Sequence, residues 1–259
     1  MLLEKGHKVS GVYYSAAGLD HNNYTELILP DLYGNMMDRL SSVYTGKEKQ
    51  SRTFLDPSHL LTMFSEWDYI IREGTRVFAT PEFRALTNSS YDLVLTFNPW
   101  GFYLGDVFDC PVVVFSPPGA FPSHTQLIGN TFNPSYQPVI TNDLSDVTSI
   151  FQRTKNFLIY HVMDLIFRRF ADTVVTSSMR SQLGYSGPNM FTIAEKRLAL
   201  ILSNSHFLTH SSQPLLQNVV DVGGVHIKKK IGVLPSDVQQ FLDSATSGAV
   251  YISFGSAIR

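Results

Sequence analysis

Two apolar stretches decide the fold: YDLVLTF at residues 91–97 and CPVVVFS at residues 110–116. Both consist mainly of branched and aromatic residues with little polar alternation, which is typical of strands covered on both faces of a parallel sheet. A short helix is predicted between them, over residues 102–108. A strand, a helix and a second strand in this order form a βαβ unit. The sequence therefore predicts an α/β fold built on a parallel sheet.

The same alternation continues on both sides of this unit. Residues 1–7 are predicted to be the end of a helix that Gly6 terminates. Near the other end, Ser236 is predicted to cap a helix as part of a capping box with Gln239, and this helix ends at Gly248. An irregular stretch is expected from residue 117 to about residue 147. The other predicted strands cover residues 8–14, 24–29, 198–204, 219–225 and 249–254, and the other predicted helices cover residues 58–86 and 148–171.

The helix predicted over residues 148–171 carries an apolar stripe near one face. Packing of this stripe into the core is the main interpretation. Contact with an apolar acceptor molecule or with a membrane surface is the alternative. The stripe consists of Phe151, Leu158, Val162, Leu165, Ile166 and Phe170.

Composition excludes several classes of protein. The chain has 259 residues, of which 44% are hydrophobic and 16% charged, and its formal net charge is −2. This is enough apolar surface for a core, and there is no basic excess for nucleic acid. Cys110 is the only cysteine, so an intrachain disulfide cannot form. No histidine spacing suits a metal site, and no GxGxxG follows a predicted strand, so a metalloenzyme and a nicotinamide dehydrogenase are both disfavoured.

The most informative pattern lies near the C-terminus. It consists of QPLLQNVVDVGGVH at residues 213–226, Leu234-Pro235, a helix, and YISFGS at residues 251–256. A strand that runs into Gly-Ser puts small residues at the carboxyl end of a sheet, where backbone N–H groups can bind a phosphate. A plain turn is the preferred interpretation of Gly255-Ser256 when these residues are taken alone.

The order of these blocks resembles the UDP-glycosyltransferase family that includes the UDP-glucuronosyltransferases. Three further blocks are similar to family motifs: GHKV at residues 6–9, YDLV at residues 91–94 and GNTFNPSYQP at residues 129–138. The last is closest to insect-type members. The resemblance covers essentially the whole chain and implies a GT-B fold of two Rossmann-like domains. Residues 1–227 are then the acceptor-binding N-terminal domain without its first strand. Residues 228–259 are a linker and the first helix and strand of a truncated UDP-sugar-binding domain.

The resemblance implies a fragment of an inverting glycosyltransferase. Such an enzyme transfers a hexosyl or glucuronosyl group from a UDP-sugar to the hydroxyl of a small lipophilic acceptor, with no metal and no other cofactor. The family's catalytic histidine would precede Met1, and the position of the family's acid falls on Phe97, so the catalytic residues are unknown. Phe97, Asn98 and His124 are candidates for the acceptor pocket, whereas Ser253, Gly255 and Ser256 are candidates for binding the donor diphosphate.

A second hypothesis is a non-catalytic acceptor-binding or dimer-partner module of the same lineage. By resemblance, the full-length protein is expected at the lumenal face of the endoplasmic reticulum membrane. The expectation for this fragment is that signal peptide and membrane anchor are absent, because no apolar run reaches about 18 residues. Asn23 and Asn88 head N-glycosylation sequons, which agree with a lumenal location. The acceptor and the UDP-sugar are the expected partners, and a homo-oligomer stays open.

Overall fold

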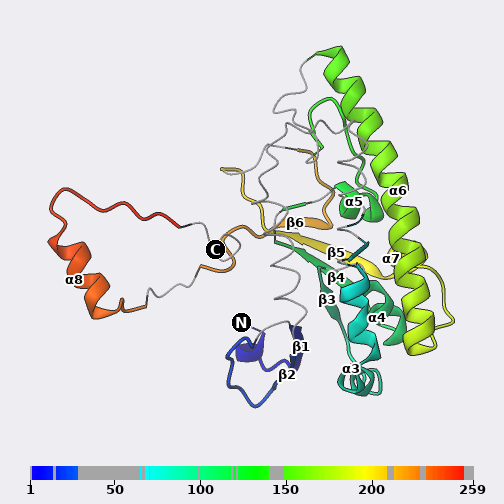
Figure 1. Cartoon of the computed structure of the whole chain (residues 1–259), viewed down its shortest axis with the longest axis horizontal. Coiled ribbons are helices and arrows are strands. Elements are labelled where there is room, and N and C mark those ends of the chain that lie inside the picture. The colour runs from blue at the N-terminus through cyan, green and yellow to red at the C-terminus, as the bar shows by residue number, and fades with distance from the viewer. Residues whose placement is uncertain are drawn as a thin grey trace.

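The computed structural model describes residues 2–13, 16–28, 65, 68–69, 71–97, 100–117, 119–120, 122–139, 149–208, 213–227 and 232–253. Strands and helices alternate along these residues, and the strands form two parallel sheets (Figure 1). The strands are β1 (Val9–Tyr13), β2 (Tyr24–Ile28), β3 (Val94–Thr96), β4 (Val112–Ser116), β5 (Leu198–Ser203) and β6 (Val219–Asp221). The helices are η1 (Leu3–Lys5), η2 (Arg76–Ala79), α3 (Pro81–Leu86), α4 (Gly101–Val107), α5 (Pro122–Thr125), η3 (Gln126–Ile128), α6 (Ile150–Leu183), α7 (Met190–Arg197) and α8 (Ser236–Ser244).

The larger sheet has the order β3-β4-β5-β6, and every neighbouring pair in it is parallel. Strand β4 is its most buried member, because Val112, Val113 and Val114 are all almost fully covered. The smaller sheet pairs β1 with β2, again in parallel. The strands predicted over residues 8–14, 24–29, 110–116, 198–204 and 219–225 are confirmed, although β6 already ends at Asp221.

Strand β3 is shorter and more exposed than the sequence predicted. It covers three residues, and Leu93 and Leu95 are 49% and 54% exposed. The expectation of a strand buried on both faces over residues 91–97 is therefore wrong. The reason is that β3 ends its sheet, with β4 as its only strand partner among the described residues. The sheet of β1 and β2 lies near this edge, since the Tyr91 hydroxyl donates to Ser10 Oγ at 3.4 Å.

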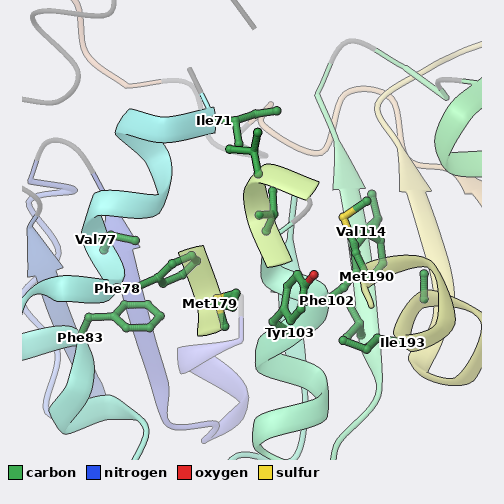
Figure 2. Close-up of a cluster of buried hydrophobic side chains, with 14 of the residues drawn as sticks. Ile71, Val77, Phe78, Phe83, Phe102, Tyr103, Val114, Met179, Met190 and Ile193 are labelled. Atoms are coloured by element: carbon green, nitrogen blue, oxygen red, sulfur yellow. The ribbon is translucent and has the colours of Figure 1, made fainter. Parts of the chain in front are cut away.

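The core lies between the larger sheet and the helices that cover it (Figure 2). Helix α4, predicted over residues 102–108 and confirmed, packs closely on β4 because a Cβ at Gly105 would lie 2.3 Å from Val112 Cγ2. Phe102 and Tyr103 of α4 are fully buried, and the Tyr103 hydroxyl shares a hydrogen bond with Thr176 of α6. The sequence did not predict α7, which Asn189 caps by accepting the Thr192 N–H at 3.0 Å.

The helix predicted over residues 58–86 is interrupted. Within its described part, backbone at 71–75 is helical, η2 follows, and α3 starts a new helix at Pro81. Thr80 caps α3, because its Oγ1 accepts the Phe83 N–H at 3.2 Å. The irregularity expected near Pro81 is confirmed, whereas Gly74 lies within continuous helical backbone. Residues 58–64 lie outside the described part.

Helix α6 is longer than predicted, with 34 residues instead of an end near residue 171. Ser149 caps it in a capping box with Gln152. Its end is fixed at Gly184, whose φ of 65° lies in the left-handed region that glycine tolerates. The C-terminal half packs on the core through Val175 and Met179, which are fully buried.

The apolar stripe on the N-terminal half of α6 does not pack into the core. Four of its predicted members, Phe151, Leu158, Val162 and Leu165, are 51–76% exposed. The core interpretation is therefore wrong for them, whereas Ile166 and Phe170 are half-buried. The buried face of this half is a different one, formed by Asn156, Ile159 and Tyr160.

Residues 131–139 cover that buried face. Asn156 is fully buried; its Oδ1 accepts the Val139 N–H at 2.9 Å, and its Nδ2 donates to Pro134 O at 3.1 Å and to Gln137 O at 2.7 Å. The Phe132 ring stacks on Tyr160 at 3.7 Å. The stretch from residue 117 to about residue 147 was expected to be irregular, but it contains the short helices α5 and η3. Residues 140–148 lie outside the described part.

Three expectations near the C-terminus are corrected. Pro235 is the N-cap residue of α8 and no side chain caps the helix, because Ser236 is already its first helical residue. The helix ends at Ser244, before Gly248. Residues 249–254 were expected to form a buried strand, but residues 249–253 have no regular structure, and Val250 and Tyr251 are 87% and 90% exposed. No strand of the described part pairs with residues 249–253.

The three hydrogen bonds of the Asn156 side chain, which we call the Asn156 bridge, give a stability test. Asn156→Ala removes all three hydrogen bonds and leaves partly buried backbone groups of residues 134–139 without these partners, so we expect the free energy of unfolding to fall by about 2–3 kcal/mol. Urea denaturation measures this change. Thr154→Ala, two residues away on the exposed side of α6, is the control and should change stability by less than about 0.5 kcal/mol. Equal losses in the two variants would contradict the bridge.

Candidate functional site at the carboxyl end of the sheet

The carboxyl ends of the parallel strands bring two predicted site residues together. Phe97 directly follows β3, and His124 lies in α5, in the segment after β4. The two rings meet edge to face, with centroids 6.0 Å apart and an interplanar angle of 88°. Ligands of open parallel α/β sheets bind at this end. The structure therefore joins two of the three acceptor-pocket candidates, while Asn98 lies outside the described residues.

His124 is held in its neutral form. Its Nδ1 is buried, and burial lowers the pKa of the imidazole from 6.5 to about 4. A general base works best when its pKa lies near the working pH. A ring with so low a pKa is a weak proton acceptor at neutral pH. His124 is therefore suited to contacting a hydroxyl group rather than to removing its proton.

The space beside His124 is small. A cavity of about 10 Å³ lies there, which is room for a single water molecule. A larger molecule does not fit into this cavity, whereas the Phe97 ring of the pair is 40% exposed. The side chains around the cavity belong to Phe102, His124, Leu127, Asp164, Phe167, Arg168, Met190 and Phe191.

A polar cluster that the sequence analysis missed lines this cavity. Arg168 Nε donates to Asp164 Oδ2 at 2.7 Å, and Arg168 Nη2 donates to Gln126 Oε1 at 2.9 Å. The guanidinium also lies 5.0 Å from the centre of the Phe191 ring. Arg168 thus ties η3 and α7 to α6. The Asp164–Arg168 pair is a local i,i+4 pattern, whereas nothing local marks the contacts of Arg168 with Gln126 and Phe191, which lie on other helices.

Two of the motif blocks lie against each other. The Leu216 N–H donates to Asn130 Oδ1 at 2.9 Å, and Gln137 Nε2 donates to Gln213 Oε1. The block at residues 129–138 therefore packs on the start of the block at residues 213–226. Residues 129–131 and 214–216 together line a cavity of about 170 Å³.

The first glycine of the Gly-Gly pair in the second block, Gly223, has a steric reason. A Cβ at Gly223 would lie 2.5 Å from Ser205 O, which the Gly223 N–H contacts at 3.0 Å, so no side chain fits. Ser205 in turn donates to Asp221 and shares a hydrogen bond of 2.6 Å with Ser203. The block is therefore fixed to the carboxyl ends of β5 and β6. Sequence reasoning did not find this hydroxyl network either.

The remaining predicted sites stay predictions. Ser253 is exposed, and Gly255 and Ser256 lie outside the described residues, so diphosphate binding there is not tested. Asn88 is exposed in the turn after α3, whereas Asn23 is half-buried before β2. Within the described part, no group of three His, Cys, Asp or Glu side chains could hold a metal ion. No helix of that part is long and apolar enough to cross a membrane.

Comparison with known protein families identifies one family that matches most of the chain. The model of the family described as "UDP-glucoronosyl and UDP-glucosyl transferase" matches residues 35–259. The chain belongs to this family. Members of the family have the GT-B fold, and the parallel sheets with their covering helices agree with its Rossmann-like domain, so the predicted fold class is confirmed.

Curated members of the family are similar over most of the chain. "UDP-glycosyltransferase UGT5" of Dactylopius coccus is 30% identical over 217 residues, which are 76% of this chain and 39% of that protein. "UDP-glucuronosyltransferase 2B10" of Homo sapiens is 27% identical over 273 residues, covering 99% of this chain and 51% of that protein. The chain thus spans about half the length, or less, of these relatives. No solved structure matched it.

The buried histidine gives a pH test. An exposed histidine of the unfolded chain has a pKa of about 6.5, so between about pH 6.5 and pH 4 the unfolded chain binds a proton that folded His124 does not. Stability linked to His124 is therefore lost as the pH falls, by up to about 3 kcal/mol. His124→Phe lacks this proton site. The difference in unfolding free energy between wild type and variant should thus shift in favour of the variant at low pH, as measured by urea denaturation at several pH values. Parallel pH curves would refute the burial of His124.

Proposed function

We propose that the chain is the acceptor-side part of a UDP-sugar-dependent glycosyltransferase. In this proposal residues 1–227 bind the acceptor, and residues 228–259 are the linker and the beginning of the UDP-sugar-binding domain. Membership of the family supports the reaction class. The edge-to-face pair of Phe97 and His124 at the carboxyl end of the sheet is the observation that carries the acceptor site.

The chemistry of this pair favours a lipophilic acceptor with a hydroxyl group. The exposed Phe97 ring offers an apolar face, and rings stack or meet edge to face with an aromatic ligand. The neutral His124 adds a polar group that does not charge near pH 7. Uncharged aromatic alcohols match both features, whereas an anionic acceptor finds no cation in the pair.

The sugar is transferred with inversion in the proposed reaction. The acceptor hydroxyl attacks the anomeric carbon from the face opposite to UDP, and a base takes up its proton. The low pKa of His124 argues against giving it this role. Phe97 carries no charge and cannot orient a catalytic histidine. The base and its partner are therefore assigned to no residue of the described part.

The donor side rests on Ser253, Gly255 and Ser256. Small residues let a diphosphate approach backbone N–H groups, which can neutralise the leaving UDP without a metal. The relatives are named as UDP-glycosyltransferases and UDP-glucuronosyltransferases. We therefore propose either a hexosyl or a glucuronosyl group as the transferred sugar. A location at the lumenal face of the endoplasmic reticulum membrane, with glycosylation at the exposed Asn88, completes the proposal.

Binding of an aromatic alcohol tests the acceptor site. We expect 1-naphthol to bind the purified chain, and Phe97→Ala to weaken that binding about tenfold, because the variant loses one ring contact worth roughly 1.4 kcal/mol. Titration calorimetry measures the dissociation constant. Val107→Ala is the matched control, since Val107 is an exposed apolar residue at the far end of α4 from Phe97. No binding by the wild type, or an equal loss in both variants, would rule out this site.

An activity assay tests whether the chain alone can transfer the sugar. We expect the purified chain, given 1-naphthol and either UDP-glucose or UDP-glucuronate, to form no glycoside above the protein-free rate, because the proposal assigns the base to no residue of the described part. Chromatography of the product mixture measures this rate. Formation of 1-naphthyl glycoside by the chain alone would show that the base is present in it.

A further inference from the structure

The cavity of about 170 Å³ lies between two motif blocks that are far apart in the sequence. One wall is the chain over residues 129–131, directly after η3, and the other is the chain over residues 214–216, before β6. Among the described residues, none lines both this cavity and the one beside His124. Gly129 keeps the space open, since its φ of 92° lies in the left-handed region and even a Cβ there would lie 3.7 Å from Leu216 Cδ1. The cavity is thus separate from the proposed acceptor site.

Contacts across the cavity hold its two walls in place. The Leu216 N–H donates to Asn130 Oδ1 at 2.9 Å, and a second hydrogen bond joins the side chains of Gln137 and Gln213. Leu215 packs against the hydrophobic core and anchors the second wall. The cavity is therefore formed before a ligand arrives, which is usual for sites that bind small molecules.

Asn130 supplies this cavity with a hydrogen-bond donor. The residue is only 6% exposed, its backbone N–H donates to Thr125 O at 3.0 Å, and its Oδ1 is taken by Leu216. Its Nδ2 donates to no acceptor among the described residues. A buried amide group with an unused donor is unfavourable. Because the side chain is otherwise enclosed, the cavity that it lines is where this donor can meet an acceptor.

The rest of the lining decides which molecule fits. Pro214, Leu215 and Leu216 are apolar, and Thr131 brings a hydroxyl group. None of the described residues that line the cavity is charged, so an ion would lose its hydration there without gaining a partner. The volume is below the roughly 300–1,000 Å³ of sites for drug-sized ligands. The cavity therefore suits a compact, uncharged molecule with an apolar body and an oxygen that accepts a hydrogen bond.

We propose that this cavity binds a small uncharged carbonyl compound. The carbonyl oxygen accepts a hydrogen bond from Asn130 Nδ2, and the apolar body contacts Leu215 and Leu216. A ketone has no hydroxyl group that could receive a sugar, so such a ligand is not a substrate of the proposed transferase and the proposal does not depend on that function. Since the ligand binds only where the two blocks meet in the folded chain, its binding stabilises their junction.

Cyclohexanone is the probe that tests this site, because it has a compact apolar ring, one carbonyl oxygen and no hydroxyl group. In an NMR titration of the nitrogen-labelled chain, the amide signals of residues 129–131, 215 and 216 should shift until they saturate. The dissociation constant should be on the order of 1 mM, as suits so small a ligand. Cyclohexylammonium, which is similar in size but cationic, should cause no shift. Shifts centred on Phe97, or no saturable shift at all, would overturn the proposal.

Two variants test the donor and the space separately. Asn130→Asp keeps an oxygen for the Leu216 N–H and replaces the donor by a second oxygen, so it should weaken cyclohexanone binding about tenfold or more. Asn88→Asp makes the same change in an exposed turn and should bind like the wild type. Leu216→Trp should fill the cavity and abolish binding, whereas Leu208→Trp, at a leucine that is 77% exposed, should not.

The same NMR spectra show whether each variant is folded, and the titration of the wild-type chain does not depend on any variant. Wild-type affinity in folded Asn130→Asp or folded Leu216→Trp would mean that the ketone binds elsewhere and would refute the site.

Discussion

The burial of β4 between β3 and β5 is the constraint on which the rest of the described structure depends. A central strand of a parallel sheet is apolar on both faces, so both faces must be covered by other parts of the chain. Gly105 lets α4 come close enough to cover Val112, and α7 and the C-terminal half of α6 complete that layer. The carboxyl end of β4 then leads into α5, which sets His124 beside Phe97. The candidate site is thus a consequence of how β4 is packed.

The central part of the fold could be predicted from local sequence, because its buried strands consist of consecutive apolar residues. CPVVVFS and LALILSN are apolar runs of strand length, and both are strands. The failures have a common cause. Whether YDLVLTF is central or at an edge, and whether the stripe on α6 faces the core, depends on which elements become neighbours, and such information is spread over the whole chain. Periodicity identifies a face of a helix but does not say what covers that face.

The candidate site divides in the same way. Phe97 and His124 followed from family blocks together with the rule that ligands bind at the carboxyl ends of parallel strands, and the structure brings them together. Arg168 and the hydroxyl network around Ser205 had no sequence signal, because their partners lie on other elements. The Gly-Gly pair lies between these cases. Its presence was visible as a motif, while its reason, the close approach of Gly223 to Ser205 O, needed the coordinates.

The exposed edge of β3 has a consequence for handling the protein. Its outer side offers backbone N–H and C=O groups in strand geometry, with no strand partner among the described residues, and Leu93 and Leu95 keep that neighbourhood apolar. Such an edge is a template on which another extended chain can be laid. Because β1 and β3 come close through Tyr91 and Ser10, the template is narrow and admits few additional strands. A higher protein concentration therefore favours pairing of this edge with a second molecule.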